Sequence, residues 1–65
     1  MLRPRIREIR KTLNYHQSDV AKELDVSRVA VSMWERGLVT PNAERAIKLA
    51  QFLNCSVSDL YEEVS

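Results

Sequence analysis

Residues 17–36, QSDVAKELDVSRVAVSMWER, decide the fold, because they predict two short helices joined by a sharp turn at Asp25 and Val26. Ser27 is a strong N-cap for the second helix. At the helical period of about 3.6 residues, one stripe of this helix is apolar and suited to burial: Val26, Ala30, Val31 and Trp34. The other stripe is a mixed set: Arg28, Val29, Ser32 and Met33. A mixed stripe on the exposed side of a helix usually contacts another molecule, so we place the function there.

The length and composition indicate one folded, helical domain. A chain of 65 residues has room for a single domain, residues 1–65. At this size the hydrophobic core is only just large enough to keep the domain folded, so compact helical packing or oligomerisation is expected. One glycine, two prolines and 45% hydrophobic residues argue against disorder and against a strand-rich protein. The composition therefore predicts an all-α fold.

Cysteine usage and hydropathy favour a reducing compartment. The single cysteine, Cys55, cannot form an internal disulfide, and no apolar run approaches the length of about 18 residues that a membrane span needs. The basic segment MLRPRIREIRK lacks the apolar stretch and the cleavage site of a secretory signal. We therefore expect a cytoplasmic protein with no membrane partner.

The charges are unevenly distributed along the chain, although the net charge is only +1. Residues 1–36 carry eight Lys and Arg against five Asp and Glu, a net +3, whereas residues 37–65 carry two against four, a net −2. This division suits a protein with one face toward phosphate, and it suits equally a protein with two ordinary solvated faces. Charge alone leaves both alternatives open.

The N-terminal region predicts one further helix, over about Arg3 to Leu13. Pro4 suits its first turn, where a missing N–H is no loss, and Ile6 and Ile9 recur with Leu13 on one face. Residues that tolerate a left-handed backbone are expected to end helices here and later in the chain: Asn14, Asp25 and Asn54.

The C-terminal region predicts two more helices. Gly37 ends the helix of the mixed stripe, and the next helix begins after Pro41 with Asn42 as its N-cap. Its buried stripe comprises Ala46, Leu49, Ala50 and Leu53. Ser56 and Asp59 form a near capping box for a last short helix. The chain is thus predicted to contain five helices and no strands.

His16 admits two interpretations, an N-cap of the helix that begins at Gln17 and a catalytic base or metal ligand. A metal site needs further ligands, yet there is no second histidine, and the one cysteine is far away in the sequence. No nucleophile or acid–base constellation accompanies it. The sequence therefore predicts no enzyme activity, no metal and no cofactor.

Residues 17–37 resemble the helix-turn-helix of the lambda-repressor/Cro (xenobiotic-response-element-like) family. The resemblance is carried by Ala21, Ser27, Val31 and the run WERG at 34–37, and it extends from Ile6 to Tyr61. Asp25 stands where the family usually has a turn glycine, and residues 38–40 lack the Lys or Arg that many relatives place there for phosphate. The resemblance implies a compact five-helix DNA-binding domain, and the second departure weakens its expected contact with phosphate.

The resemblance also implies a role for individual residues. The second helix of the unit would lie in the major groove of DNA, with base contacts from Arg28, Val29, Ser32 and Met33. Phosphate contacts are expected from Gln17, Ser27, Asn42 and Arg36; the first three lie at helix starts, where free backbone N–H groups favour phosphate oxygens. Arg10 and Glu35 match a pair that forms an internal salt bridge in the family. The ordinary alternatives are solvated side chains, plain helix caps and unpaired charges.

One recognition helix covers about half of a two-fold symmetric site, so two copies of the chain are implied. By resemblance the homodimer interface lies at the C-terminal region. Three apolar residues there are not needed to form the core: Phe52, Val57 and Tyr61. They either form the interface or pack at the periphery of the core. The expected function is a dimeric transcriptional regulator, a repressor, that reads a palindromic double-stranded DNA operator. The alternative is a protein-interaction module of the same fold, such as an antitoxin or an adaptor with a protein partner.

Overall fold

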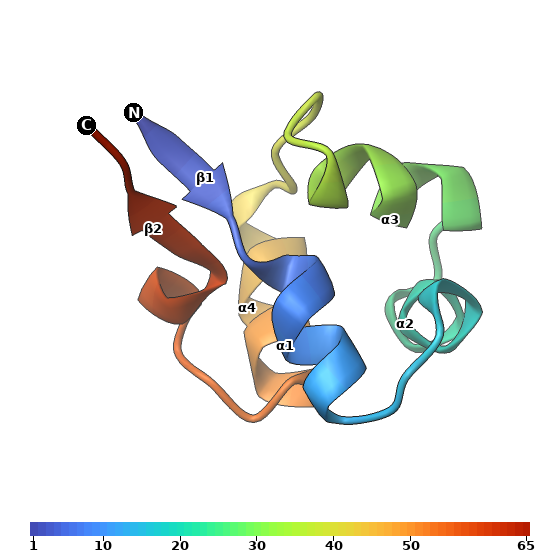
Figure 1. The fold of residues 1–65 in the computed structure, drawn as a ribbon. Helices are drawn as coiled ribbons and strands as arrows, with labels where there is room; N and C mark the ends of the chain where they lie inside the picture. The colour runs from blue at the N-terminus through green and yellow to red at the C-terminus, as the bar shows by residue number, and fades with distance from the viewer.

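The computed structural model describes residues 1–65 and shows a mainly helical fold with a small pair of strands (Figure 1). In chain order the elements are β1 (Leu2–Pro4), α1 (Ile6–Thr12), α2 (Gln17–Leu24), α3 (Arg28–Glu35), α4 (Ala43–Phe52), the 3-10 helix η1 (Val57–Leu60) and β2 (Tyr61–Glu63). The predicted helical fold is confirmed. The predicted count of five α-helices is wrong, because the fifth segment is a single 3-10 turn.

The turn between α2 and α3 has the geometry that the sequence predicts. Asp25 ends α2 in the left-handed conformation, with φ 55° and ψ 48°, and the N–H of Val26 donates to the carbonyl of Ala21 at 3.0 Å. The hydroxyl of Ser27 accepts a hydrogen bond from the N–H of Ala30 at 3.1 Å and so caps α3. Two helix ends elsewhere use the same left-handed conformation, at Asn14 and Asn54.

Asp25→Gly is expected to raise the free energy of unfolding by about 0.5–1 kcal/mol. A residue with a Cβ is strained at positive φ, whereas glycine adopts this conformation without that cost. Urea denaturation of the wild type and the variant measures the difference. Asp25→Ala is the control, because it keeps the Cβ and removes only the carboxylate. Equal gains in both variants would show that the carboxylate, and not the backbone, limits stability here.

The strands β1 and β2 pair in antiparallel orientation, so the prediction of no strands is wrong. Pro4, which lacks an N–H, lies opposite Tyr61 at one end of the pair. Beside it the Arg3 guanidinium pairs with Glu62 across the strands and with Glu8 of α1 at 3.0 Å. The predicted helix start at Arg3 is therefore wrong as well. The partner strand lies near the other end of the chain, where a periodicity read from neighbouring residues cannot find it.

The segment η1 is held at its start by the capping pair that the sequence predicts. A carboxylate oxygen of Asp59 accepts hydrogen bonds from the N–H of Ser56 at 3.0 Å and from its hydroxyl at 2.8 Å. These hydrogen bonds favour the charged form and lower the pKa of Asp59. The stabilisation they give is therefore present at neutral pH and is lost as the pH falls through the lowered pKa.

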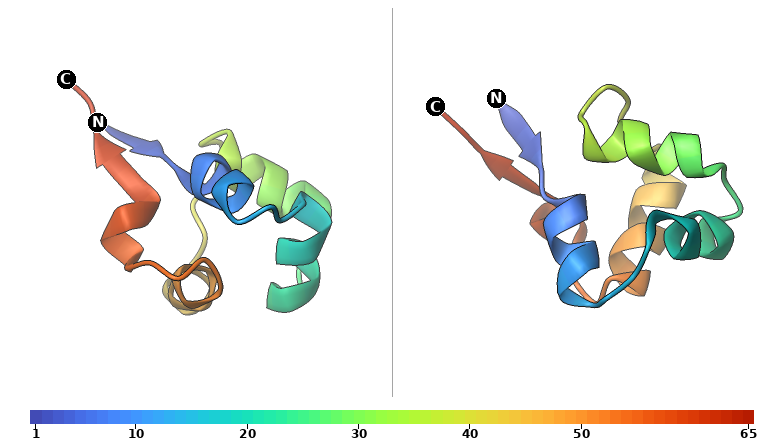
Figure 2. Two further views of the ribbon diagram at one scale, coloured as in Figure 1. Left: turned by 60° about the horizontal axis from the view of Figure 1, so that its bottom comes forward. Right: turned by 45° about the vertical axis from the view of Figure 1, so that its right-hand side comes forward.

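The core lies where α1 to α4 and η1 meet, and the two chain ends lie side by side at one edge (Figures 1 and 2). Its buried members are Ile6, Val20, Ala21, Leu24, Val31, Trp34, Leu49, Ala50, Leu53 and Leu60. Beside the core the ring of Tyr15 stacks on Phe52, with centroids 4.5 Å apart. The inward stripes predicted for α3 and α4 are thus confirmed. None of the helices is long and apolar enough to cross a membrane.

Candidate nucleic-acid interface

The mixed stripe of α3 faces away from the core, and α3 lies along an outer edge of the molecule (Figure 1). Arg28 and Val29 are exposed, Val29 to 66%, and Ser32 and Met33 are half-buried. Arg28 forms no ion pair with any carboxylate of the chain. Its guanidinium N–H groups are therefore free to bind a ligand.

The end of α3 is tied to α1 by an ion pair between Arg10 and Glu35. Arg10 Nε donates to Glu35 Oε2 at 2.6 Å, and Arg10 Nη2 donates to Oε1 at 3.2 Å. The third donor, Nη1, binds the carbonyl oxygen of Tyr15 at 2.8 Å. Arg10 is 7% exposed and the Glu35 side chain 3%. Since both charges are buried, this pair holds the two helices in one arrangement.

Gln17, the first residue of α2, joins this network. Its side-chain N–H donates to Glu35 Oε1 at 3.0 Å, so one of its two amide hydrogens is already used. The remaining hydrogen and the free backbone N–H groups of the first turn can still donate to a ligand. Arg36, which follows α3 directly, is exposed and has no acidic partner. Gln17 and Arg36 thus flank the buried pair from α2 and α3.

Ser27 and Asn42 cap their helices, and each side chain retains a hydrogen-bond donor group that the cap does not use. The Ser27 hydroxyl accepts from the backbone at the start of α3, and its own proton remains available. Asn42 Oδ1 accepts from the N–H of Arg45 at 2.9 Å, which leaves the amide NH2 group free. Both side chains are exposed. Each can therefore cap a helix and donate to an anion at the same time.

The three residues predicted for a dimer interface have different environments. Phe52 stacks on Tyr15 and, like Tyr61, is half-buried against the core. The Tyr61 hydroxyl is fully buried with no hydrogen-bond partner, and burial raises its pKa. Val57 is 40% exposed on η1. The surplus apolar surface at this end of the molecule thus lies on Val57 rather than on the two aromatic residues.

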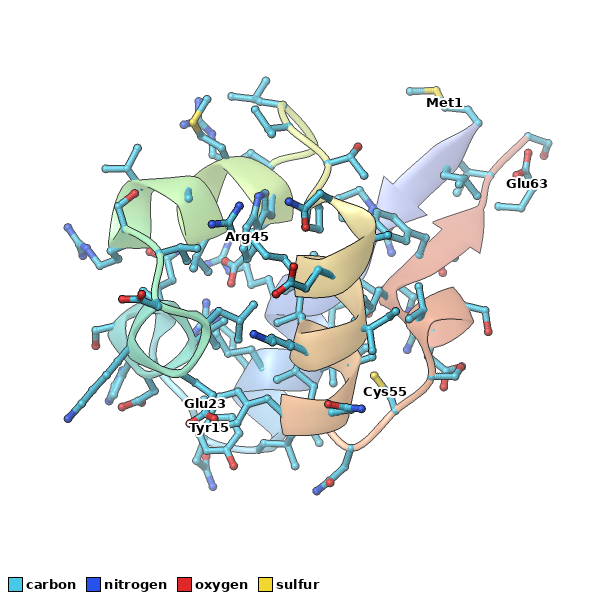
Figure 3. The ribbon with its side chains drawn as sticks, turned by 180° about the vertical axis from the view of Figure 1, so that it is seen from behind. Met1, Tyr15, Glu23, Arg45, Cys55 and Glu63 are labelled. Carbon is cyan, nitrogen blue, oxygen red and sulfur yellow. The ribbon has the colours of Figure 1, made fainter.

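The remaining titratable groups include one free cysteine, Cys55. No group of three or more His, Cys, Asp or Glu side chains is placed to hold a metal ion. Cys55 is half-buried beside the core, and burial raises the pKa of its thiol (Figure 3). A raised pKa leaves little thiolate at neutral pH.

Two features of this surface were not predicted. The hydrogen bond between Gln17 and Glu35 depends on how α2 and α3 cross, and no sequence signal indicates it. Arg7 of α1 and Arg36 both line a hollow next to α3. The one available signal was its spacing, three residues before Arg10, which places the two side chains on neighbouring positions of α1.

The fold and the pair α2 and α3 define a helix-turn-helix protein. The model of a helix-turn-helix family matches residues 6–60. The chain belongs to this lambda-repressor/Cro-like family. Repressor protein C2 of Salmonella phage P22 is 44% identical over 52 residues, which cover 80% of this chain and 24% of that protein. The transcriptional regulator DicA of Escherichia coli K12 is also 44% identical over 52 residues, 80% of this chain and 38% of its own length. The chain thus spans well under half of these two relatives.

Solved structures agree with this assignment. The P22 c2 repressor in complex with synthetic operator 9T has a TM-score of 0.82 and 43% identity, with 86% of this chain and 85% of that chain covered. The N-terminal DNA-binding domain of SinR from Bacillus subtilis has a TM-score of 0.76 and 33% identity, with 86% of this chain and 83% of that chain covered.

Proposed function

We propose that the chain is a sequence-specific DNA-binding transcriptional regulator, a repressor, that acts without catalysis in the cytoplasm. The observation that carries this proposal is the outward stripe of α3, on which Arg28 has no acidic partner, between helix starts that keep free donors. The similarity to a repressor solved on an operator supports it.

In the proposed complex α3 lies in the major groove and reads bases with its mixed stripe. The Arg28 guanidinium gives two parallel hydrogen bonds to O6 and N7 of a guanine. The methyl groups of Val29 suit a thymine methyl group, and Ser32 and Met33 contact neighbouring base edges or sugars. The reading of sequence therefore depends mainly on Arg28.

The proposed backbone contacts come from four residues, three of which lie at helix starts: Gln17, Ser27, Asn42 and Arg36. Helix starts provide N–H groups that point at phosphate oxygens, and the capping hydroxyl and amide add donors of their own. These contacts fix the register of the protein on the duplex but carry no sequence information.

Selection of bound sites from a random DNA pool tests this function. The expected result is a two-fold symmetric motif whose half-sites lie about 10 base pairs apart, because the recognition helices of a symmetric dimer enter successive major grooves. A pool without enrichment, together with a stable complex with another protein, would instead favour an interaction module.

We propose further that the chain binds as a homodimer through its C-terminal region. Val57 on η1 and Ile47 on α4 are exposed, to 40% and 51%, on elements that contact each other. Phe52 and Tyr61 also belong to the C-terminal region and are packed against the core. Burial of such apolar side chains between two protomers is the expected source of affinity.

Val57→Glu is expected to weaken dimerisation at least about tenfold, because a carboxylate would be buried in an apolar interface. Sedimentation at a series of concentrations measures the change. Val29→Glu is the matched control. Val29 is more exposed than Val57, but it lies on the mixed stripe of α3 and not in the C-terminal region. A wild type that stays monomeric at high micromolar concentration, both free and with DNA, would contradict the dimer.

A further inference from the structure

An apolar ridge runs along the exposed side of α3 and continues past its C-terminal end. We define it by three residues: Val29, Met33 and Leu38. Val29 and Leu38 are 66% and 59% exposed, and Met33 is half-buried. Residues four apart on a helix lie one above the other on the same face, so Val29 and Met33 are neighbours. Both belong to the mixed stripe, so its outward side carries apolar surface beside its polar groups.

The backbone at the end of α3 brings Leu38 to this ridge. Gly37 has φ 75°, its N–H donates to the carbonyl of Trp34 at 3.2 Å, and the N–H of Leu38 donates to the carbonyl of Met33 at 3.0 Å. These two hydrogen bonds form a Schellman motif, in which an apolar contact between the residues at the positions of Leu38 and Met33 is common. The turn therefore extends the ridge beyond the helix, along the outer edge that α3 follows (Figure 1).

The charges around the ridge indicate what covers it. Arg28 lies directly before Val29, and Arg36 lies between Met33 and Leu38 in the sequence. Both are exposed, and neither forms an ion pair with a carboxylate of the chain. An apolar strip between unpaired cations is complementary to the DNA major groove, where phosphates form both rims and the C5-methyl groups of thymine lie on the floor. An apolar surface of another protein would leave these cations without a partner.

The spacing of the ridge fits the spacing of base pairs. Four residues of α-helix rise by about 6 Å, which is close to two base-pair steps of about 3.4 Å. Val29 and Met33 can therefore contact methyl groups that belong to different base pairs of one half-site. Leu38, beyond the end of the helix, can contact a third.

We propose that this ridge reads the C5-methyl groups of pyrimidines, and that the protein accepts 5-methylcytosine in place of thymine at the positions beneath the ridge. Both bases present the same methyl group to the major groove, although their hydrogen-bonding groups differ. Methylation of a cytosine beneath the ridge thus raises the affinity of the site. This inference rests on the proposed function, and it adds Leu38 to the residues that read DNA and cytosine methylation to the signals that change its binding.

Base analogues test the inference with the unchanged protein. Deoxyuridine lacks the methyl group of thymidine and keeps its hydrogen-bonding groups, so each such replacement beneath the ridge is expected to weaken binding about fourfold, the loss that one buried methyl group gives. Replacement of the same thymine–adenine pair by cytosine–guanine should also weaken binding, and 5-methylcytosine should recover about fourfold of that loss. Fluorescence anisotropy titrations on the selected site measure each affinity.

Leu38→Gln connects this dependence to the ridge, with Leu2→Gln as its matched control. Leu2 is 61% exposed, as Leu38 nearly is, but it lies on β1. Leu38→Gln should abolish the deoxyuridine effect at one symmetric pair of positions, and Met33→Gln should abolish it at a second pair. Leu2→Gln should keep the whole pattern of the wild type. Thermal unfolding of each variant checks that the fold is intact.

The possible outcomes separate this inference from the proposed function. A wild type that binds no DNA would overturn both. A selected symmetric site that tolerates deoxyuridine at every position, or binds 5-methylcytosine no better than cytosine, would overturn the inference alone. Methyl dependence that persists in both Met33→Gln and Leu38→Gln would also overturn it, as would a complex with another protein that these two variants lose while their DNA binding stays normal.

Discussion

Arg10→Ala is expected to lower the free energy of unfolding by about 3–5 kcal/mol. This is a large part of the total free energy of unfolding of a protein domain, which is about 5–15 kcal/mol. The substitution leaves the Glu35 carboxylate buried, with Gln17 as its remaining hydrogen-bond partner. It also removes the donor from the carbonyl of Tyr15. A buried charge without its counter-charge has lost hydration with no compensation, so the cost exceeds that of any exposed pair.

Urea denaturation measures this loss, and two further variants show its origin. Arg3→Ala removes one partner of an exposed ion pair with Glu62, where water replaces the lost contact, and should cost far less. The double variant Arg10→Met with Glu35→Leu removes both charges and should recover most of the stability. It also keeps the test decisive if Arg10→Ala does not fold. A loss in Arg10→Ala no larger than in Arg3→Ala would contradict a structural role for the buried pair.

Local signals account for the parts of the fold that were predicted from sequence. The caps at Ser27 and Asn42 and the left-handed residue Asp25 are set by chemistry within a few residues, and the structure has all three. The pairing of β1 with β2 joins opposite ends of the chain, so it could not be predicted from neighbouring residues. The short last segment is a 3-10 turn of four residues, and β2, whose partner is at the other end of the chain, follows it directly.

The candidate site divides in the same way. Helical periodicity determines which side chains share the outward stripe of α3, so that stripe could be predicted from α3 alone. The convergence of Arg10 and Gln17 on Glu35 depends on how three helices cross, and only the family resemblance indicated the ion pair. The hollow of Arg7 and Arg36 depends on the same crossing, and no motif pointed to it.

Arg28→Ala is expected to weaken binding to the selected site by about 1–3 kcal/mol, or roughly 5- to 150-fold, and to relax base preference at one symmetric pair of positions. Alanine cannot supply the paired donors that guanine O6 and N7 require, and the other residues of the stripe, Val29, Ser32 and Met33, offer no cation. Binding to random DNA should change far less, because non-specific affinity comes from phosphate contacts that this substitution leaves in place.

Matched salt titrations on the selected site and on random DNA separate base reading from backbone contact. For Arg28→Ala the loss should be confined to the selected site, with the salt slope nearly unchanged. Arg36→Ala is the control, because a lost phosphate contact should weaken both DNAs alike and reduce the slope by about one. If Arg28→Ala behaves like Arg36→Ala, Arg28 holds only the backbone, and sequence reading must come from Val29, Ser32 and Met33.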